Sequence, residues 1–120
     1  MRPMTLRPPS RYRERLTAIE ESCDALGYEI AAEKASSLGR AGKAVGEAMD
    51  ALRAFESEHG SNNADMGETA RRERTRLLKR AAAATHAYFI QRELCGLRRH
   101  HDAIALFGIP PAVLARLGAT

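Results

Sequence analysis

Three glutamates and the cations near them are the first residues whose types and spacing could do chemistry. Glu29 and Glu33 are one helical turn apart, so a helix places both carboxylates on one face. An antiparallel second helix would bring Glu93 across from them, a cluster that could bind a metal. Lys34 and Arg92 are near enough in this arrangement to neutralise it. We therefore predict an ion-pair network instead of a metal site, with the members Glu29, Glu33, Arg92 and Glu93.

The histidines and cysteines do not assemble a recognisable site. A helical di-iron site needs two Glu-x-x-His motifs, but the sequence holds one, from Glu56 to His59. His100 and His101 are adjacent, so on a helix they point about 100° apart and make poor joint ligands. Cys95 falls late in its expected helix, where the helix dipole opposes a thiolate. We therefore expect no catalytic residues, no metal and no cofactor, and we do not expect an enzyme.

Two segments could contact nucleic acid. Residues 71–80, RRERTRLLKR, carry six basic side chains and one acidic one, without interleaved aromatic residues. The tail AIALFGIPPAVLARLG is similar to a helix-turn-helix, with Gly108 and Ile109 at the turn. Its would-be recognition helix ends at Gly118 and offers one cation, Arg116, whereas groove reading needs several such contacts. We predict a packed C-terminal helix here and keep a nucleic-acid-binding regulator as the alternative function.

The elements that must position these residues are helical. Alanine is abundant and β-branched residues are scarce among the 120 residues, which favours an all-α fold. A seven-residue apolar repeat predicts a long helix from about Ser22 to His59, with Gly60 as its cap. Ser10 and Thr17 are alternative starts, so a helical extension before Ser22 stays open. The repeat comprises Ala31, Leu38, Val45 and Leu52, with a second row at Ala41, Ala48 and Phe55.

The second half of the chain predicts further helices. Asp65 with Glu68 is similar to a capping box and would open a second long helix. That helix either pauses at Gly96 or runs on towards Phe107, and Pro110 opens a last short helix. Residues 1–21 are expected to form a flexible or partly helical arm, and residues 22–120 a single α-helical domain.

Three glycines inside the first helix predict how it packs. Gly39, Gly42 and Gly46 each cost about 1 kcal/mol relative to alanine in a helix interior, which suggests a closely packed neighbour. An antiparallel hairpin whose facing residue numbers sum to about 123, within one turn, places Gly39 opposite Ala84 and Gly42 opposite Ala81. The alternative is a kink at these glycines.

The charge distribution favours the same hairpin. Residues 21–60 carry a net charge of −4 and residues 61–120 a net charge of +5. The predicted register pairs Arg76 with Glu47 and Arg72 with Asp50, contacts worth about 0–1 kcal/mol each when exposed. Two long helices alone cannot bury both apolar faces, so we expect dimerisation to complete a four-helix bundle.

Three stretches resemble an uncharacterised family of short alphaproteobacterial proteins, a domain of unknown function. They are residues 28–42 (YEIAAEKASSLGRAG), residues 89–98 (FIQRELCGLR), and residues 108–110 leading into residues 113–118 (GIP and VLARLG). The resemblance implies a bacterial cytosolic protein. It carries no known activity and supplies no catalytic residues.

The leading functional interpretation is a non-enzymatic protein–protein interaction or structural module. The sequence has no run long enough to cross a membrane and no apolar secretory segment at its start, so we expect a cytoplasmic protein. Its two cysteines, Cys23 and Cys95, are then expected as reduced thiols, with a disulfide left open. The expected partners are a second copy of the chain and an unknown protein, with no membrane contact.

Overall fold

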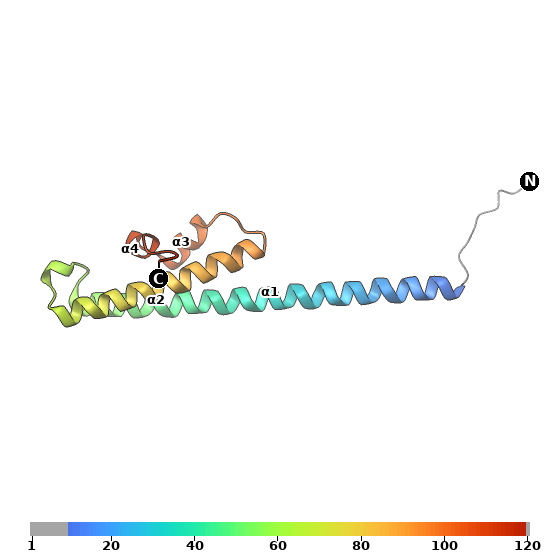
Figure 1. Cartoon of the computed structure of the whole chain (residues 1–120), viewed down its shortest axis with the longest axis horizontal. Helices are drawn as coiled ribbons and strands as arrows, with labels where there is room; N and C mark the ends of the chain where they lie inside the picture. Colours follow the sequence, from blue (N-terminus) through green and yellow to red (C-terminus); the bar gives the residue numbers. More distant parts are fainter. Residues whose placement is uncertain (1–9, 120) are drawn as a thin grey trace, which may run out of the picture. The chain divides into compact units, whose positions relative to one another are not determined.

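A computed structural model describes the main chain of residues 10–119 and the side chains of residues 14–119. This part of the chain is helical and contains no strand, which confirms the all-α class. Residues 1–9 of the arm expected at residues 1–21 lie outside the described residues. The elements are α1 (Ser10–His59), the 3₁₀ helix η1 (Asn63–Asp65), α2 (Glu68–Leu94), α3 (His101–Phe107) and α4 (Pro111–Leu114), as Figure 1 shows.

The chain divides into two compact units, Met1–Glu33 and Lys34–Thr120, and α1 contributes residues to both. The sequence predicts a boundary twelve residues earlier, after residue 21. In the first unit, the main chain is helical from Ser10, the earliest of the three predicted starts. Every described side chain of this unit, from residue 14 to residue 33, is exposed.

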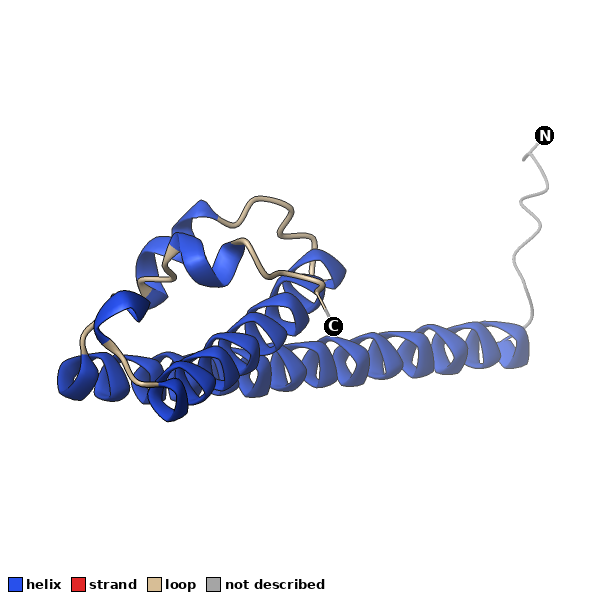
Figure 2. Cartoon of the chain, turned by 60° about the vertical axis from the view of Figure 1, so that its left-hand side comes forward, coloured by secondary structure: helices blue, strands red, loops and turns tan. Residues whose placement is uncertain are grey.

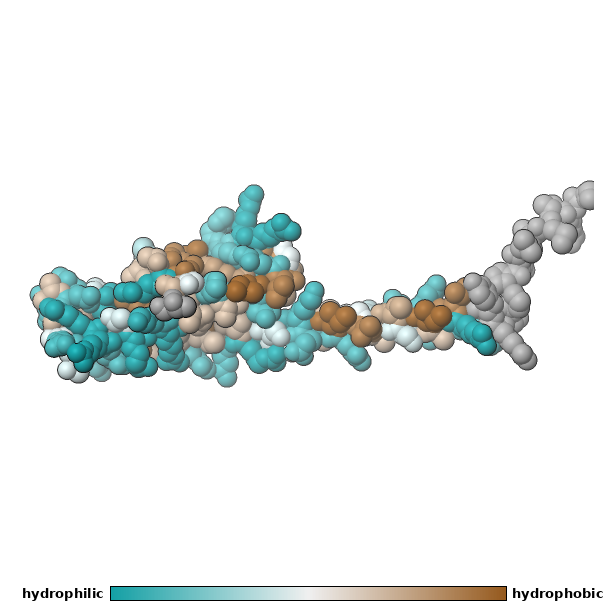
Figure 3. Space-filling view, viewed as in Figure 1, coloured by the Kyte–Doolittle hydropathy of each residue, from teal (hydrophilic) through white to brown (hydrophobic). Residues whose placement is uncertain are grey.

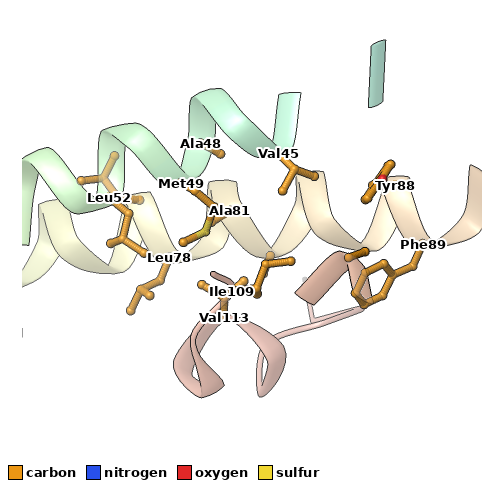
Figure 4. Close-up of a cluster of buried hydrophobic side chains, with 13 residues drawn as sticks. Val45, Ala48, Met49, Leu52, Leu78, Ala81, Tyr88, Phe89, Ile109 and Val113 are labelled. Atoms are coloured by element: carbon orange, nitrogen blue, oxygen red, sulfur yellow. The ribbon is translucent and has the colours of Figure 1, made fainter. Parts of the chain in front are cut away.

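The core belongs to the second unit. Val45, Ala48 and Leu52 on α1 are at most 1% exposed, as their positions in the predicted apolar repeat require. Their spacing of three and four residues places them on one face of the helix, and α2 runs back beside this part of α1 (Figure 1). Figure 4 shows these side chains meeting those of α2 and of the C-terminal segment. The other buried members are Met49, Leu77, Leu78, Ala81, Ala82, Tyr88, Phe89, Ala103, Ile109 and Val113.

Left-handed glycines end the helices of the second unit. Gly60 follows α1 with φ +81°, and Gly108 closes α3 with φ +61°, as the sequence predicts. The second predicted helix ends at Leu94 before Gly96, which has φ +89°, and does not continue to Phe107. Glycine adopts this conformation without the steric cost that a Cβ imposes. The chain therefore reverses after α2 and returns α3 and α4 to the core.

The turn between α1 and α2 is longer than the sequence predicts, and Figure 2 shows it as the loop that carries η1. The side chain of Asn62 accepts a hydrogen bond from the Ala64 N–H and caps η1. The N-cap of α2 is Gly67, so the predicted capping box of Asp65 and Glu68 is wrong. Residues Asn63–Asp65 form the 3₁₀ helix η1, and α2 consequently begins only at Glu68.

The longer turn changes the register of the two long helices. Glu56 Oε1 on α1 lies 3.9 Å from Arg74 Nη2 on α2, a pair whose residue numbers sum to 130. The predicted register of about 123 is therefore displaced by about two helical turns. The contacts between α1 and α2 that were expected from the predicted register therefore differ in the structure.

Candidate interaction surfaces

Gly39, Gly42 and Gly46 of α1 lie near aromatic rings or in open space. A Cβ at Gly42 would be 3.4 Å from Cε1 of Tyr88 and 3.8 Å from Cζ of Phe107. A Cβ at Gly46 would be 3.8 Å from Phe107 Cε1, and at Gly39 it would meet no described atom within 4 Å.

The expected facing of Gly39 with Ala84 and of Gly42 with Ala81 is therefore wrong. The shift in register moves the alanine run along α1 and brings Tyr88 to Gly42. Ala81 is instead fully buried in the core, and Ala84 is half-buried beside it.

These glycines form one wall of an open groove of about 670 Å³ in the second unit. Tyr88 and Phe107 form the facing part, with ring centroids 5.5 Å apart and planes at 85°, a favourable edge-to-face arrangement. Lys43 and Glu47 lie at the rim, where their charged atoms are 3.9 Å apart. The missing glycine side chains thus leave space beside two aromatic rings.

The predicted polar network is centred on Arg92, but its partners come from the C-terminal segment. Arg92 is 7% exposed. Its Nη2 donates to Asp102 Oδ1 at 2.9 Å and to the Arg99 carbonyl at 3.0 Å, and its Nε donates to His100 Nδ1 at 3.2 Å. The Nε2 of His100 lies 3.1 Å from Glu93 Oε1. The network therefore clamps the α2–α3 connection through the Nε and Nη2 donors of the guanidinium.

Ring stacking and the ionisation of Asp102 also stabilise this clamp. The His100 ring stacks on Phe89, with centroids 4.1 Å apart and planes at 3°. The pKa of Asp102 is lowered, mainly because its carboxylate accepts the Ala103 N–H and also because Arg92 is close, although burial opposes the shift. Both effects favour the ionised carboxylate. We assign the cluster a structural role.

Sequence reasoning found two members of the clamp and missed two. Arg92 and Glu93 were expected, whereas His100 and Asp102 were not assigned to the network. Glu29 and Glu33 lie in the first unit, and their pairing with Arg92 and Glu93 stays a prediction. Gly96 is the signal in the sequence that could have placed His100. A helix that ends before this glycine and then reverses brings His100 back beside the last turn of α2.

The basic run 71–80 forms its ion pairs mostly within α2. Arg72 pairs with Glu68 at 2.7 Å and Arg76 with Glu73 at 2.6 Å, so the predicted partners Asp50 and Glu47 are wrong. Partners three or four residues apart on one helix need no particular register between helices.

The C-terminal tail packs as the sequence predicts. Val113 in α4 is fully buried and Ile109 is 5% exposed. The helix α4 itself spans only Pro111–Leu114. Its buried side chain faces the core and is not available to a nucleic-acid groove.

The first unit carries an apolar surface that the sequence reasoning missed. Four large apolar side chains here are between 39% and 58% exposed, namely Leu16, Ile19, Leu26 and Ile30. With the exposed Cys23 they follow one another at spacings of three, four, three and four residues. This spacing aligns them on one face of the helix. We call these five residues the apolar stripe.

The stripe is visible on the surface of α1 as hydrophobic patches in Figure 3. A shallow groove of about 310 Å³ runs along it between Ile19 and Leu26, with Cys23 on its lining. The spacing was available in the sequence. The apolar repeat predicted from the sequence begins only at Ala31 and therefore does not include it.

Metal and membrane signals are absent from the described part of the chain. Between residues 10 and 119, no three histidine, cysteine, aspartate or glutamate side chains are grouped so as to hold a metal ion. Within the same residues, no helix combines the length and the apolar character that crossing a membrane requires. Cys23 and Cys95 are both free thiols in this structure.

Comparison with known proteins places the chain in a family. The model of a family of unknown function, DUF6665, matches residues 15–120, so the chain belongs to that family. The matched region includes the whole apolar stripe and all of the second unit. The expectation of an uncharacterised family is confirmed at this level, and the alphaproteobacterial origin stays a prediction. No curated protein and no solved structure matches the chain.

Proposed function

We propose that this member of the DUF6665 family is a non-enzymatic protein–protein interaction module that binds through the apolar stripe. The observation that carries the proposal is the exposure of four large aliphatic side chains on one helical face, with no core of their own unit to cover them. Contiguous exposed apolar surface of this kind marks interaction sites in soluble proteins.

The pattern also indicates the form of the partner surface. Burial of a leucine or isoleucine side chain stabilises a complex by about 1.5–3 kcal/mol when the burial is complete. Anchors at positions i, i+3, i+7, i+10 and i+14 of a helix fit an apolar groove or a second amphipathic helix. The partner is therefore a protein that presents a complementary apolar groove or an apolar helix face.

The finer predictions from the sequence belong to this proposal. They are a long antiparallel hairpin, its completion to a four-helix bundle by a second copy, and a cytoplasmic, bacterial setting. Support for the hairpin comes from the position of α2 beside α1 and from the Glu56–Arg74 contact at 3.9 Å.

The test compares three forms of the full chain in a lysate of the cells that make it. The first is unchanged, the second carries Ile19→Glu with Leu26→Glu on the stripe, and the third carries Ala25→Glu with Ala32→Glu. The control pair has the same seven-residue spacing and the same added charge, but points more than a quarter-turn away from the stripe.

We expect the unchanged chain and the control to elute in size-exclusion chromatography well above the 13.2 kDa of a monomer. The stripe variant should elute as a monomer. Elution of all three forms at one volume would refute the interaction surface.

The nucleic-acid alternative makes a different prediction. A regulator that binds through residues 71–80 would show DNA affinity that falls steeply between low and high salt. An interaction module should show no such salt-dependent affinity for DNA. Any weak DNA binding that is measured should be the same for the unchanged chain and for the stripe variant.

A further inference from the structure

We propose that the partner of the apolar stripe is a second copy of the same chain, joined in a parallel, in-register, two-stranded coiled coil over residues 15–34. This inference rests on the proposed function, because it names the occupant of the same surface. It goes further by fixing the orientation of the two chains and the residues that meet.

The stripe fits the heptad pattern of a coiled coil, written with positions a to g. Leu16, Cys23 and Ile30 take position a, and Ile19 and Leu26 take position d. In a parallel in-register pair, each a or d residue meets the same residue of the second copy. Five consecutive layers are thereby formed from side chains that are exposed in the single chain.

Charges beside the stripe match a second copy in this orientation. In parallel pairs, a g residue of one chain lies beside the e residue five positions later in the other. Arg15 at g then meets Glu20 of the second copy, and Glu29 at g meets Lys34 of the second copy. The remaining g–e contact is uncharged. Symmetry doubles both attractions, and no like charges meet at these positions.

An antiparallel pair is less complementary. The antiparallel alignment that joins Arg15 to Glu29 of the second copy also brings the two Glu20 carboxylates together, because e residues face e residues in that orientation. It sets Cys23 against Ile19 of the second copy. Shifting the alignment by one heptad removes the Arg15–Glu29 attraction. The charge pattern therefore selects the parallel pair.

The stripe also has a defined end. The next d position is Glu33, where the carboxylates of the two copies would meet and repel, so the apolar layers stop after Ile30. The proposed coiled coil is accordingly short and reversible, since three heptads are near the lower limit for independent stability.

Cross-linking through Cys23 tests the orientation directly. The full chain with Cys95→Ser keeps Cys23 as its single thiol and is treated with diamide, which accepts the two electrons and two protons released when two thiols form a disulfide. The control chain carries Cys23→Ser, Cys95→Ser and Ala25→Cys, which moves the thiol to an outward position of the same helix.

We expect the Cys23 chain to run mostly as a covalent dimer on a non-reducing gel, and the control to stay mostly monomeric. Equal cross-linking of the two chains would overturn the parallel register. So would preferential cross-linking of Cys23 to a chain that carries Ile19→Cys and Cys23→Ser, because that pair meets in the antiparallel arrangement.

A charge exchange gives an independent readout that does not use cysteine. Glu20→Arg turns both Arg15–Glu20 attractions into repulsions and should weaken dimerisation, measured by analytical ultracentrifugation, by roughly ten-fold. Adding Arg15→Glu to Glu20→Arg restores opposite charges and should recover most of the affinity. Failure of the double variant to recover would overturn the inference.

Failure of this inference can be distinguished from failure of the proposed function. A purified chain that sediments as a monomer at tens of micromolar overturns the self-pairing, whether or not the lysate complex forms. If the stripe-dependent complex persists in the lysate, the interaction function stands and its partner is another protein. If it is absent as well, both proposals fail. Circular dichroism of every variant checks that the second unit remains folded.

Discussion

Substituting Gly108 by alanine tests how the C-terminal segment is held against α1. Gly108 closes α3 in the left-handed conformation, with φ +61°. A Cβ built there would lie 2.8 Å from Nη2 of Arg53, which donates a hydrogen bond to the carbonyl of Phe107. The alanine must therefore accept a strained backbone and also displace the Arg53 guanidinium from its acceptor.

The two effects can be separated in magnitude. A left-handed alanine costs about 1–2 kcal/mol, and loss of the hydrogen bond from Arg53 costs about 1 kcal/mol net at a half-exposed site. Gly108→Ala should thus lower the free energy of unfolding by about 2–3 kcal/mol, and Arg53→Ala by about 1 kcal/mol. The double variant should lose about 2–3 kcal/mol, because the hydrogen bond can be lost only once.

A double-mutant cycle measured by urea unfolding, followed by far-ultraviolet circular dichroism, gives the coupling energy, expected at about 1 kcal/mol. Gly60→Ala is the matched control, because Gly60 has φ +81° and no described atom within 4 Å of a built Cβ. It should cost the backbone strain alone and show no coupling to Arg53→Ala. Additive losses for Gly108 and Arg53 would refute the contact as the anchor of α3.

Other substitutions test the groove, the core and the clamp. Gly39→Ala should stabilise the chain by about 0.8–1 kcal/mol in urea unfolding, since a Cβ there meets open space, whereas Gly42→Leu should destabilise it by about 1–3 kcal/mol through overpacking on Tyr88. Thr85→Val should stabilise by about 1 kcal/mol, because the fully buried hydroxyl has no described hydrogen-bond partner. Asp102→Asn should lower the thermal midpoint near pH 7 and flatten its acid dependence. The lowered pKa of Asp102 means that its stabilisation is complete above the unfolded-state pKa of about 3.9 and is lost as pH falls through the folded-state pKa.

Each of these expectations has a contrary outcome. Destabilisation by Gly39→Ala would mean that something covers that position, and a neutral Gly42→Leu would place Gly42 away from Tyr88. A less stable Thr85→Val would reveal a hydrogen bond to the hydroxyl. If the thermal midpoint of Asp102→Asn still falls at acidic pH as steeply as that of the unchanged chain, Asp102 does not contribute to the clamp.

The helix ends were predictable because their causes are local. Gly60 and Gly108 each follow an apolar periodic segment, and a left-handed residue there needs glycine whatever the tertiary structure. The buried positions Val45 and Leu52 were predictable for a related reason, since the repeat fixes which face of α1 is apolar. These features depend on the sequence within one or two turns.

The register between helices was not predictable, because it depends on the length of the turn that joins them. The predicted capping box at Asp65 and Glu68 satisfied local rules, yet the chain folded η1 in its place and began α2 after Gly67. A shift of two turns changes every cross-helix partner at once. Arg76 consequently pairs within α2 and Gly42 lies beside Tyr88 instead of alanine.

The exposed helix of the first unit raises a thermodynamic question that the proposed pairing answers. Residues 14–33 are helical although every described side chain among them is exposed, and Gly27 within them costs about 1 kcal/mol. Extension of an existing helix into water gains little per residue, and most helical stability in proteins comes from packing of the apolar face. A partner that covers the apolar stripe binds only the helical form and therefore stabilises it by mass action. Helix formation in this segment and association of the chain are then one coupled equilibrium, so a substitution that raises helix propensity on the face opposite the stripe, such as Tyr28→Ala, should tighten binding without adding a contact.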